Sequence, residues 1–258
     1  SCGEGAEWEE DDGMELLSRK GRADLPLYPV KVLQFGEGNF LRAFVDWQIQ
    51  KMNQKADFHG GVAIVQPLPR GRVGELKKQD LLYTLYLRGM ENGRPADEHE
   101  VISCVSAAVD PYAEFGDFLA LAGCETLPFI VSNTTEAGIA FQETDRFSDR
   151  PQSSYPGKLT RFLYQRFLDF EADETKGFFI IPCELIDRNG EKLREIVLRY
   201  AGLWNLGSEF LRWLTTANTF CCSLVDRIVP GYPREEIGKI TRELGYADRL
   251  ADVAERFH

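Results

Sequence analysis

The sequence of 258 residues lacks a long apolar run, an excess of basic residues and paired cysteine motifs. No run approaches the roughly 20 apolar residues of a membrane-spanning helix, and the start is acidic, unlike a secretory signal. The balance of 41 acidic and 30 basic residues gives a net charge of −11, which would repel nucleic acid and anionic lipid. We therefore expect a cytoplasmic protein that binds neither nucleic acid nor a membrane.

The cysteines show no Cys-x-x-Cys pair and no histidine at metal-ligand spacing. They are Cys2, Cys104, Cys124, Cys183, Cys221 and Cys222. Adjacent Cys221 and Cys222 would point to opposite faces of a strand, which argues against a shared metal ion. A chain with 43% hydrophobic residues needs no disulfide bonds to hold its core, so we expect reduced, mostly buried thiols and no metal site.

Residues 1–13 are acidic and rich in glycine, with almost no aliphatic side chains. Such a segment has little to bury, so we expect it to be a disordered extension, with Met14 as a candidate natural start. From residue 14 to residue 258 the composition is that of a globular protein, and we expect these residues to form one folded domain.

Short apolar runs alternate with amphipathic segments from Val30 onward, which is typical of α/β folds. The pattern predicts buried strands at 30–35, 62–65, 127–131 and 178–181, and helices at 39–52, 112–122, 158–170, 192–200, 209–217, 234–244 and 247–257. Runs at 82–87 and 101–105 flank the turn Glu91-Asn92-Gly93, which indicates an antiparallel excursion. The fold class predicted is α/β: a Rossmann-like, doubly wound, mostly parallel sheet with added antiparallel strands and a helical C-terminal end.

The first strand ends in Gly36-Glu37-Gly38, and a helix is expected to follow with Asn39 as its N-cap. In a dinucleotide fingerprint the first glycine makes the turn, and the second lets the backbone approach the pyrophosphate at the helix N-terminus. Leu41 occupies the place of the third glycine, which implies a wider gap between helix and strand. A plain strand-to-helix turn that uses glycine only for its conformation explains the same pattern.

The acid that often ends the second strand and holds the adenosine ribose is absent here, because Gln66 follows Val65. Gln66 could bond the ribose hydroxyls instead. Arg70 or Arg72 could bind a 2′-phosphate or could lie in a solvated loop. We therefore expect residues 14–258 to form an NAD(P)-binding Rossmann domain, and these residues leave both NAD and NADP open as its cofactor.

Residues 132–136, with the sequence SNTTE, follow a later strand at the edge of the sheet where ligands of open α/β folds bind. Asn133, Thr134 and Thr135 could contact the nicotinamide side of a cofactor. Thr134 or Thr135 could also cap a helix, with Glu136 in its first turn.

Two further acids follow expected strands, Glu184 and Asp226, and either could face a substrate in an active-site cleft. The alternatives are a surface or capping role for Glu184 and an internal ion pair between Asp226 and Arg227.

Four segments in this order resemble the polyol-specific long-chain dehydrogenases, the mannitol dehydrogenase family. They are LQFGEGNFLRAF from Leu33, SNTTEAGI from Ser132, PCELID from Pro182 and LVDRIVPGYP from Leu224. Within that family the chain looks most like the branch of tagaturonate reductases, also called altronate oxidoreductases, rather than mannitol dehydrogenases or fructuronate reductases. The resemblance runs from about residue 14 to the end and is more specific than the glycine pair alone.

The resemblance implies an NAD-linked, metal-independent oxidoreductase that reduces the keto group of tagaturonate, a sugar acid, to altronate in hexuronate breakdown. The cofactor-binding residues would be Leu33, Gln34, Phe35, Gly36, Glu37, Gly38, Asn39, Phe40, Leu41, Arg42 and Ala43, with Gln66, Asn133, Thr134 and Thr135. In this family a lysine acts as acid and base, helped by an asparagine and a histidine, on a second, mainly helical domain. Those catalytic residues would lie beyond His258, so this chain alone would be inactive.

The same resemblance bears on the two acids. Glu184-Leu185 takes the place of an Asp-Asn pair of the mannitol dehydrogenases, which favours the uronate branch, and Asp226 would face the cleft to the second domain. Two other classes stay open: a dinucleotide-binding regulatory module without redox chemistry, and another Rossmann enzyme such as a methyltransferase. No pattern in the sequence indicates an oligomeric state.

Overall fold

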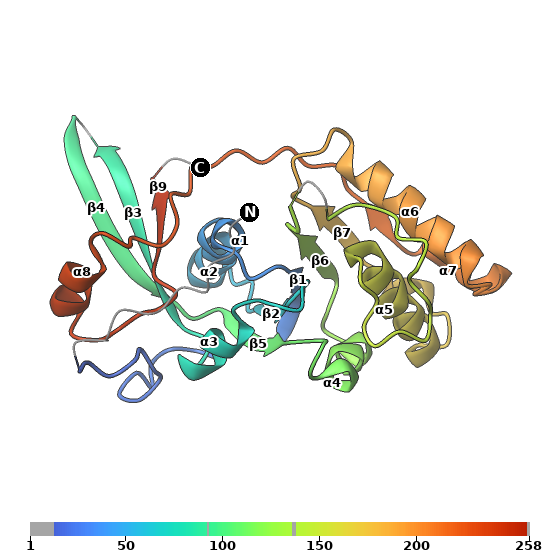
Figure 1. Ribbon diagram of the computed structural model, residues 1–258, viewed down its shortest axis with the longest axis horizontal. Coiled ribbons are helices and arrows are strands. Elements are labelled where there is room, and N and C mark those ends of the chain that lie inside the picture. Colours follow the sequence, from blue (N-terminus) through green and yellow to red (C-terminus); the bar gives the residue numbers. More distant parts are fainter. Residues whose placement is uncertain (1–12, 92, 136–137, 257–258) are drawn as a thin grey trace.

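Six parallel strands form the central sheet of the computed structural model, which describes residues 13–91, 93–135 and 138–256 (Figure 1). The strands are β1 (Val30–Phe35), β2 (Gly61–Val65), β5 (Val105–Val109), β6 (Phe129–Ser132), β7 (Phe179–Pro182) and β8 (Thr219–Phe220). Their spatial order is β5-β2-β1-β6-β7-β8, the 3-2-1-4-5-6 order of a doubly wound dinucleotide-binding fold. The predicted fold class is confirmed. The extension predicted at 1–13 lies outside the described residues except for Gly13.

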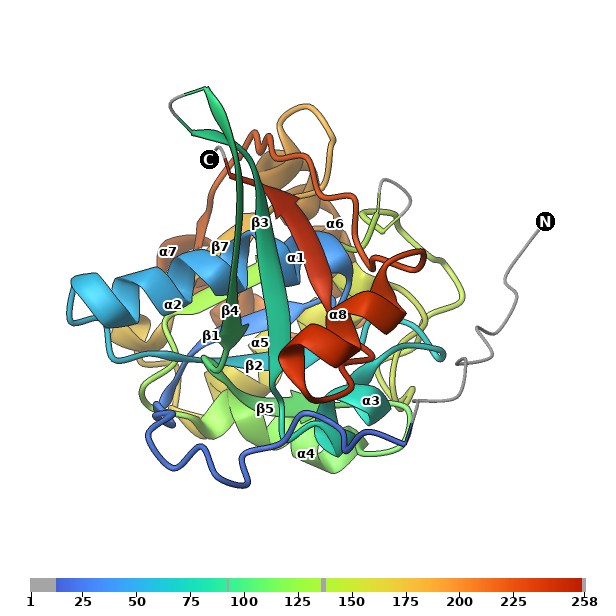
Figure 2. The same cartoon turned by 90° about the vertical axis from the view of Figure 1, so that its left-hand side faces the viewer.

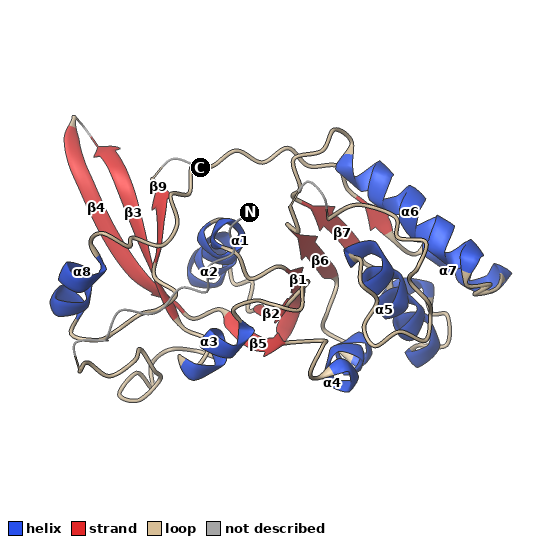
Figure 3. Cartoon of the chain, viewed as in Figure 1, coloured by secondary structure: helices blue, strands red, loops and turns tan. Residues whose placement is uncertain are grey.

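Helices cover both faces of this sheet (Figures 1 and 3). They are α1 (Asn39–Ala43), α2 (Val45–Lys55), α3 (Val73–Lys78), α4 (Phe115–Ala120), α5 (Tyr155–Asp169), α6 (Asn189–Leu203), α7 (Ser208–Thr216) and α8 (Ile237–Leu244), with short 3-10 turns at Leu121–Gly123 and Glu174–Lys176. In the part of the chain that is described, no helix is both long and apolar enough to cross a membrane.

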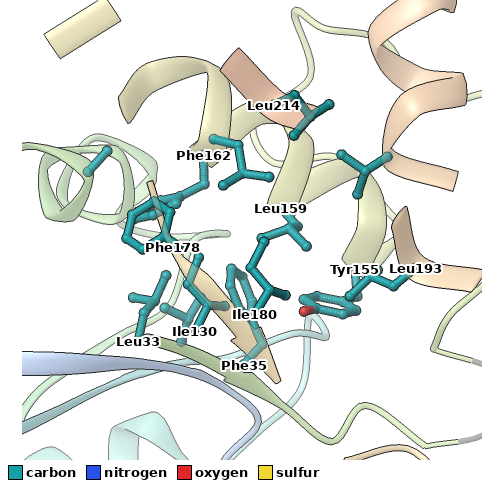
Figure 4. Close-up of a cluster of buried hydrophobic side chains, with 14 of the residues drawn as sticks. Leu33, Phe35, Ile130, Tyr155, Leu159, Phe162, Phe178, Ile180, Leu193 and Leu214 are labelled. Atoms are coloured by element: carbon teal, nitrogen blue, oxygen red, sulfur yellow. The ribbon is translucent and has the colours of Figure 1, made fainter. Parts of the chain in front are cut away.

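Alternate residues of the strands enter two different cores, as the period of two in a strand requires. Leu33 and Phe35 of β1 face the core under α4, α5, α6 and α7, which also contains Phe162 of α5 and Leu193 of α6 (Figure 4). Val32 faces the opposite core, together with side chains of α1 and α2. This burial on both faces explains why the strands read as nearly continuous apolar runs.

A second, three-stranded sheet packs on the far side of α1 and α2 (Figure 2). It contains β3 (Tyr83–Glu91), β4 (Arg94–Ile102) and β9 (Asp252–Glu255) in the order β4-β3-β9. Strands β3 and β4 are antiparallel, as the sequence predicts, whereas β9 runs parallel to β3. The helices α1 and α2 therefore lie between two sheets.

Two predictions of secondary structure are wrong. The run 101–105 is not one strand, because β4 ends at Ile102 and β5 begins at Val105 in the other sheet. The helix predicted at 247–257 is replaced by β9 in the described part of that range. There Val253 packs with Ile240 of α8 while Ala254 enters the core beside α1, so pairing with β3 overrides the local pattern.

The five described cysteines are all free thiols. Cys104 and Cys183 are buried, Cys124 and Cys221 are half-buried, and Cys222 is exposed. The described part of the chain contains no group of three or more His, Cys, Asp and Glu side chains that could hold a metal ion.

Candidate cofactor site

The strand order reverses between the neighbouring strands β1 and β6. From its carboxyl end the chain leaves β1 toward α1 on one face of the sheet, and it leaves β6 toward the opposite face (Figure 1). Connections that diverge in this way make a crevice at the carboxyl ends of the two strands. Backbone bonds join the three central strand ends. The Gly36 N–H donates to Val65 O (3.0 Å), and the Asn133 N–H donates to Phe35 O (3.1 Å). The predicted glycine turn and the SNTTE segment therefore meet at one place.

Gly36 is required by the protein's own structure. Its φ is +129°, a conformation that side chains disfavour. A Cβ at this position would also lie 2.9 Å from Asn133 O and 3.1 Å from Leu41 Cδ1. Leu41, at the place of the third glycine of the fingerprint, thus fills the space under the turn.

Gly38 differs from Gly36, because no described part of the chain needs a glycine there. Its φ is −70°, and a Cβ would meet no atom within 4 Å. The space above Gly38 is open, as close approach of a pyrophosphate to the backbone requires. A turn that used glycine only for its conformation would explain Gly36 but would leave Gly38 without a reason.

Helix α1 begins at Asn39, with Gly38 rather than Asn39 as its N-cap, so the predicted capping role of Asn39 is wrong. The Asn39 side chain instead accepts a hydrogen bond from Arg42 Nη2 (2.8 Å). The N–H groups of a first helical turn have no carbonyl partner within the helix. Those of Asn39 and Phe40 lie in this first turn, and their binding to a pyrophosphate stays a prediction.

Several of the predicted cofactor residues are buried and form the support of the loop. These are Leu33, Gln34, Phe35, Leu41, Arg42 and Ala43. Arg42 is the central one: its Nε donates to Glu37 O (3.0 Å), and its Nη1 donates to Leu250 O (2.6 Å). Its Nη2 lies 3.8 Å from the carboxylate of Asp252 in β9. Arg42 therefore ties the glycine turn to the second sheet.

Two acids behind this loop have strongly raised pKa values because both are buried. Burial raises the pKa of Asp46 to about 7, although Tyr83 OH (3.1 Å) and Gln34 Nε2 (3.4 Å) donate to its carboxylate. Burial also raises the pKa of Asp252 to about 7 against the opposing effect of Arg42. The sequence gives no sign of this network, because no local pattern links helix α2 to strands β3 and β9.

The loop after β2 uses the Gln66 side chain for its own structure. Gln66 is buried, its Nε2 donates to Leu68 O (2.9 Å), and its Oε1 accepts from the Val73 N–H (3.4 Å). Arg70 is exposed and Arg72 is half-buried. A direct bond from Gln66 to a ribose stays a prediction, and it would require Gln66 to give up a partner.

Glu184 is buried beneath the SNTTE segment, so the surface or capping interpretation is wrong. Its carboxylate accepts bonds from Ser132 Oγ, Thr134 Oγ1 and the Thr134 N–H, each 3.0 Å long. Asn133 Nδ2 donates to Cys183 O (3.4 Å), and Thr135 has a φ of +72°. No helix begins at 133–135 or 138–154 in the described residues, so the capping interpretation of Thr134 and Thr135 is also wrong. Glu184 acts as a brace that shapes this edge of the crevice.

Asp226 is exposed, and the predicted ion pair with Arg227 is wrong, because the Arg227 guanidinium binds elsewhere. It donates to Glu255 O (2.7 and 3.2 Å) and to Ala43 O (2.9 Å), and it lies over the Trp47 ring. A pocket of about 520 Å³ lies beside this segment and is lined by Glu184 and by residues 185–188 and 222–225. The structure thus brings the segment that precedes Asp226 next to Glu184.

Comparison of the sequence with known protein families finds a match that covers most of the chain. Residues 30–258 match the Rossmann domain of mannitol dehydrogenase. The chain is 54% identical over 245 residues to an altronate oxidoreductase of Bacillus subtilis and 50% identical over 248 residues to one of Yersinia pestis. These alignments cover 95% of this chain and 51% of each relative, so the chain spans about half the length of the curated relatives it matches.

Solved structures of lower identity share the fold. A D-sorbitol dehydrogenase in substrate-free form superposes with a TM-score of 0.75 at 22% identity, over 94% of this chain and 54% of that one. Mannitol 2-dehydrogenase of Pseudomonas fluorescens, in a ternary complex with NAD and D-mannitol, has the same TM-score at 20% identity, over 93% of this chain and 53% of that one.

Proposed function

The chain belongs to the mannitol dehydrogenase family through its Rossmann domain, and we propose that it is the NAD-binding half of an oxidoreductase that interconverts altronate and tagaturonate. The observation that carries the cofactor site is the open space at Gly38, at the point where the strand order reverses. Identity of 49–54% to the altronate oxidoreductases, against 20–22% to the mannitol and sorbitol enzymes, favours the sugar-acid substrate.

The residues of this chain fit a dinucleotide. The N–H groups at the start of α1 would bind the pyrophosphate with the helix dipole behind them, while Arg42 holds the turn rigid from within the protein. Asn133 and Thr134, braced by Glu184, would lie on the nicotinamide side. When bound, the nicotinamide supplies or accepts the hydride.

The proton of the reaction would come from outside this chain. We place the acid/base lysine, with its asparagine and histidine, on a second and mainly helical domain that follows residue 258. Glu184 is already held by three hydrogen bonds at the strand end, which suits a bracing role better than proton transfer. Asp226, exposed beside the pocket, would face the cleft to that second domain.

The open space at Gly38 allows a direct test. We expect Gly38→Val to fold normally but to weaken NADH binding at least about tenfold, because its branched side chain occupies the path of the pyrophosphate. Gly202→Val is the matched control, since Gly202 is an exposed glycine of α6 with nothing within 4 Å. Calorimetric titration with NADH and circular dichroism would be measured for both variants.

Unchanged NADH affinity in Gly38→Val would refute this site. The substrate would be tested by following NADH oxidation by the complete encoded protein with tagaturonate, fructuronate or fructose. Faster turnover of fructuronate or fructose would assign the protein to another branch of the family. Binding of NADH with no turnover of any of the three would point to a dinucleotide-binding module without redox chemistry.

A further inference from the structure

The carboxylate of Glu37 lies at the end of the second parallel strand, although Glu37 belongs to the turn after the first. Its Oε1 accepts a hydrogen bond from the backbone N–H of Arg72 (3.3 Å), in the loop that follows β2. A Cβ at Gly71 would overlap both Glu37 Oε1 and the amide of Gln66. The loop after β2 therefore packs closely around this carboxylate, and the glycine at 71 makes room for it.

The protein leaves this carboxylate only partly satisfied. Glu37 is 9% exposed, and its Oε2 has no hydrogen-bond partner among the described residues. Burial raises the pKa of Glu37, while the charges of Arg42 and Arg72 act in the opposite direction. A buried polar atom without a partner is uncommon in a folded protein and calls for an explanation. A hydrogen-bond donor on a bound ligand would provide one.

The place of this carboxylate indicates which part of a ligand it would meet. In doubly wound folds the hydroxyls of the adenosine ribose bind at the carboxyl end of the second strand, where an acid usually accepts their hydrogen bonds. Here that strand is followed by Gln66, whose amide is already bonded to Leu68 O and to the Val73 N–H. The turn after β1 thus brings to this position the carboxylate that the end of β2 lacks.

We propose that Glu37 is the residue that selects NAD(H) over NADP(H), by accepting a hydrogen bond from the adenosine ribose and by repelling a 2′-phosphate. This inference rests on the proposed function, because it assumes that a dinucleotide binds at the glycine turn. Arg72 lies in the same loop, and its Nη1 also has no hydrogen-bond partner among the described residues. An arginine there could favour a 2′-phosphate, so the two residues predict opposite preferences that can be measured.

The test compares the affinities of NADH and NADPH for the complete encoded protein. We expect the wild-type protein to bind NADH at least about tenfold more tightly than NADPH, since one hydrogen bond to a charged group contributes about that much. Glu37→Gln keeps the size of the side chain and removes its charge, and it should lower this ratio about tenfold, mainly by tighter NADPH binding. Gly71→Ala should lower the ratio too, because the new methyl group displaces the carboxylate.

Glu114→Gln is the matched control. It removes the same charge from an exposed ion pair with Lys77 and should leave the ratio unchanged. A second probe is NADH that lacks the 2′-hydroxyl of the adenosine ribose. It should bind more weakly than NADH to the wild-type protein but equally well to Glu37→Ala, an effect that a purely structural role of Glu37 would not produce.

The outcomes separate this inference from the proposed function. Binding of NADH with an unchanged NADH/NADPH ratio in Glu37→Gln and in Gly71→Ala overturns the role of Glu37 and leaves the dinucleotide site intact. A wild-type preference for NADPH also overturns it and assigns the phosphate to Arg72. A wild-type protein that binds neither dinucleotide overturns both proposals.

Discussion

Replacement of Arg42 by methionine should destabilise the protein strongly, because this side chain is fully buried and methionine cannot replace the hydrogen bonds of its guanidinium. The guanidinium donates to Glu37 O, Leu250 O and Asn39 Oδ1 at 2.6–3.0 Å and offsets the charge of Asp252 at 3.8 Å. Removal of one partner from a buried ion pair costs about 3–5 kcal/mol. The lost hydrogen bonds are part of that figure and are not added to it.

The cost should depend on pH in a defined direction. Burial raises the pKa of Asp252 to about 7 even with Arg42 present, and loss of the arginine should raise it further. At pH 5 the Asp252 carboxyl is then protonated and needs no counter-charge, so the loss should be smaller than at pH 8. The double variant with Asp252→Asn should recover part of the stability at pH 8, because it removes the unpaired charge.

Urea unfolding followed by circular dichroism at pH 5 and pH 8 would measure these free energies. Arg42→Lys is the conservative comparison, since it keeps the charge but cannot form the forked set of bonds. A loss below about 1 kcal/mol for Arg42→Met at pH 8, or an equal loss at both pH values, would refute the reasoning, because a surface-like arginine would behave in that way.

Three further substitutions test the buried network and the packing around helix α6. Burial raises the pKa of Asp46 from 3.8 to about 7, so between these values the folded state holds a proton that the unfolded state has lost. The stability of the wild-type protein should therefore fall as pH rises through this window. Urea unfolding of Asp46→Asn at several pH values should show a shallower fall, and an unchanged slope would contradict the raised pKa of Asp46. A Cβ at Gly190 would overlap the backbone carbonyl of Cys221, so Gly190→Ala should cost about 1–3 kcal/mol in thermal unfolding. Gly202→Ala, with open space around it, should be neutral or stabilising by up to about 1 kcal/mol, and equal effects of the two changes would show that the contact at Gly190 is absent.

Local patterns in the sequence were sufficient to predict the central sheet of the fold. Apolar runs at β1, β2, β6 and β7 require burial on both faces, and that is possible only in a sheet covered by helices on both sides. The glycine turn was also visible, because a strand that turns directly into a helix needs a residue that tolerates positive φ at Gly36. The turn between β3 and β4 was predicted for the same reason, because it contains a glycine, Gly93, with positive φ.

Strand β9 could not be found in this way. Residues 252–255 are too few to distinguish a helical from an extended pattern, and their partner β3 is far away in the sequence. The break after Ile102 was hidden for the same reason: one small polar residue, Ser103, does not distinguish a continuous strand from two strands that enter different sheets. Pairing with distant strands decided both cases.

The residues of the candidate site fall into two groups: those that a local pattern identifies, and those whose partners only tertiary packing provides. A linear pattern identifies Gly36 and Gly38, because their roles concern the backbone at their own positions. It cannot show that Glu37 reaches the end of β2, that Arg42 meets Asp252, or that Glu184 braces Thr134. Such pairs form only when strands and loops distant in sequence pack together, and burial then alters the pKa values of the carboxylates among them. The location of the glycine turn was therefore encoded locally, whereas the surroundings that we propose select its ligand arise from tertiary packing.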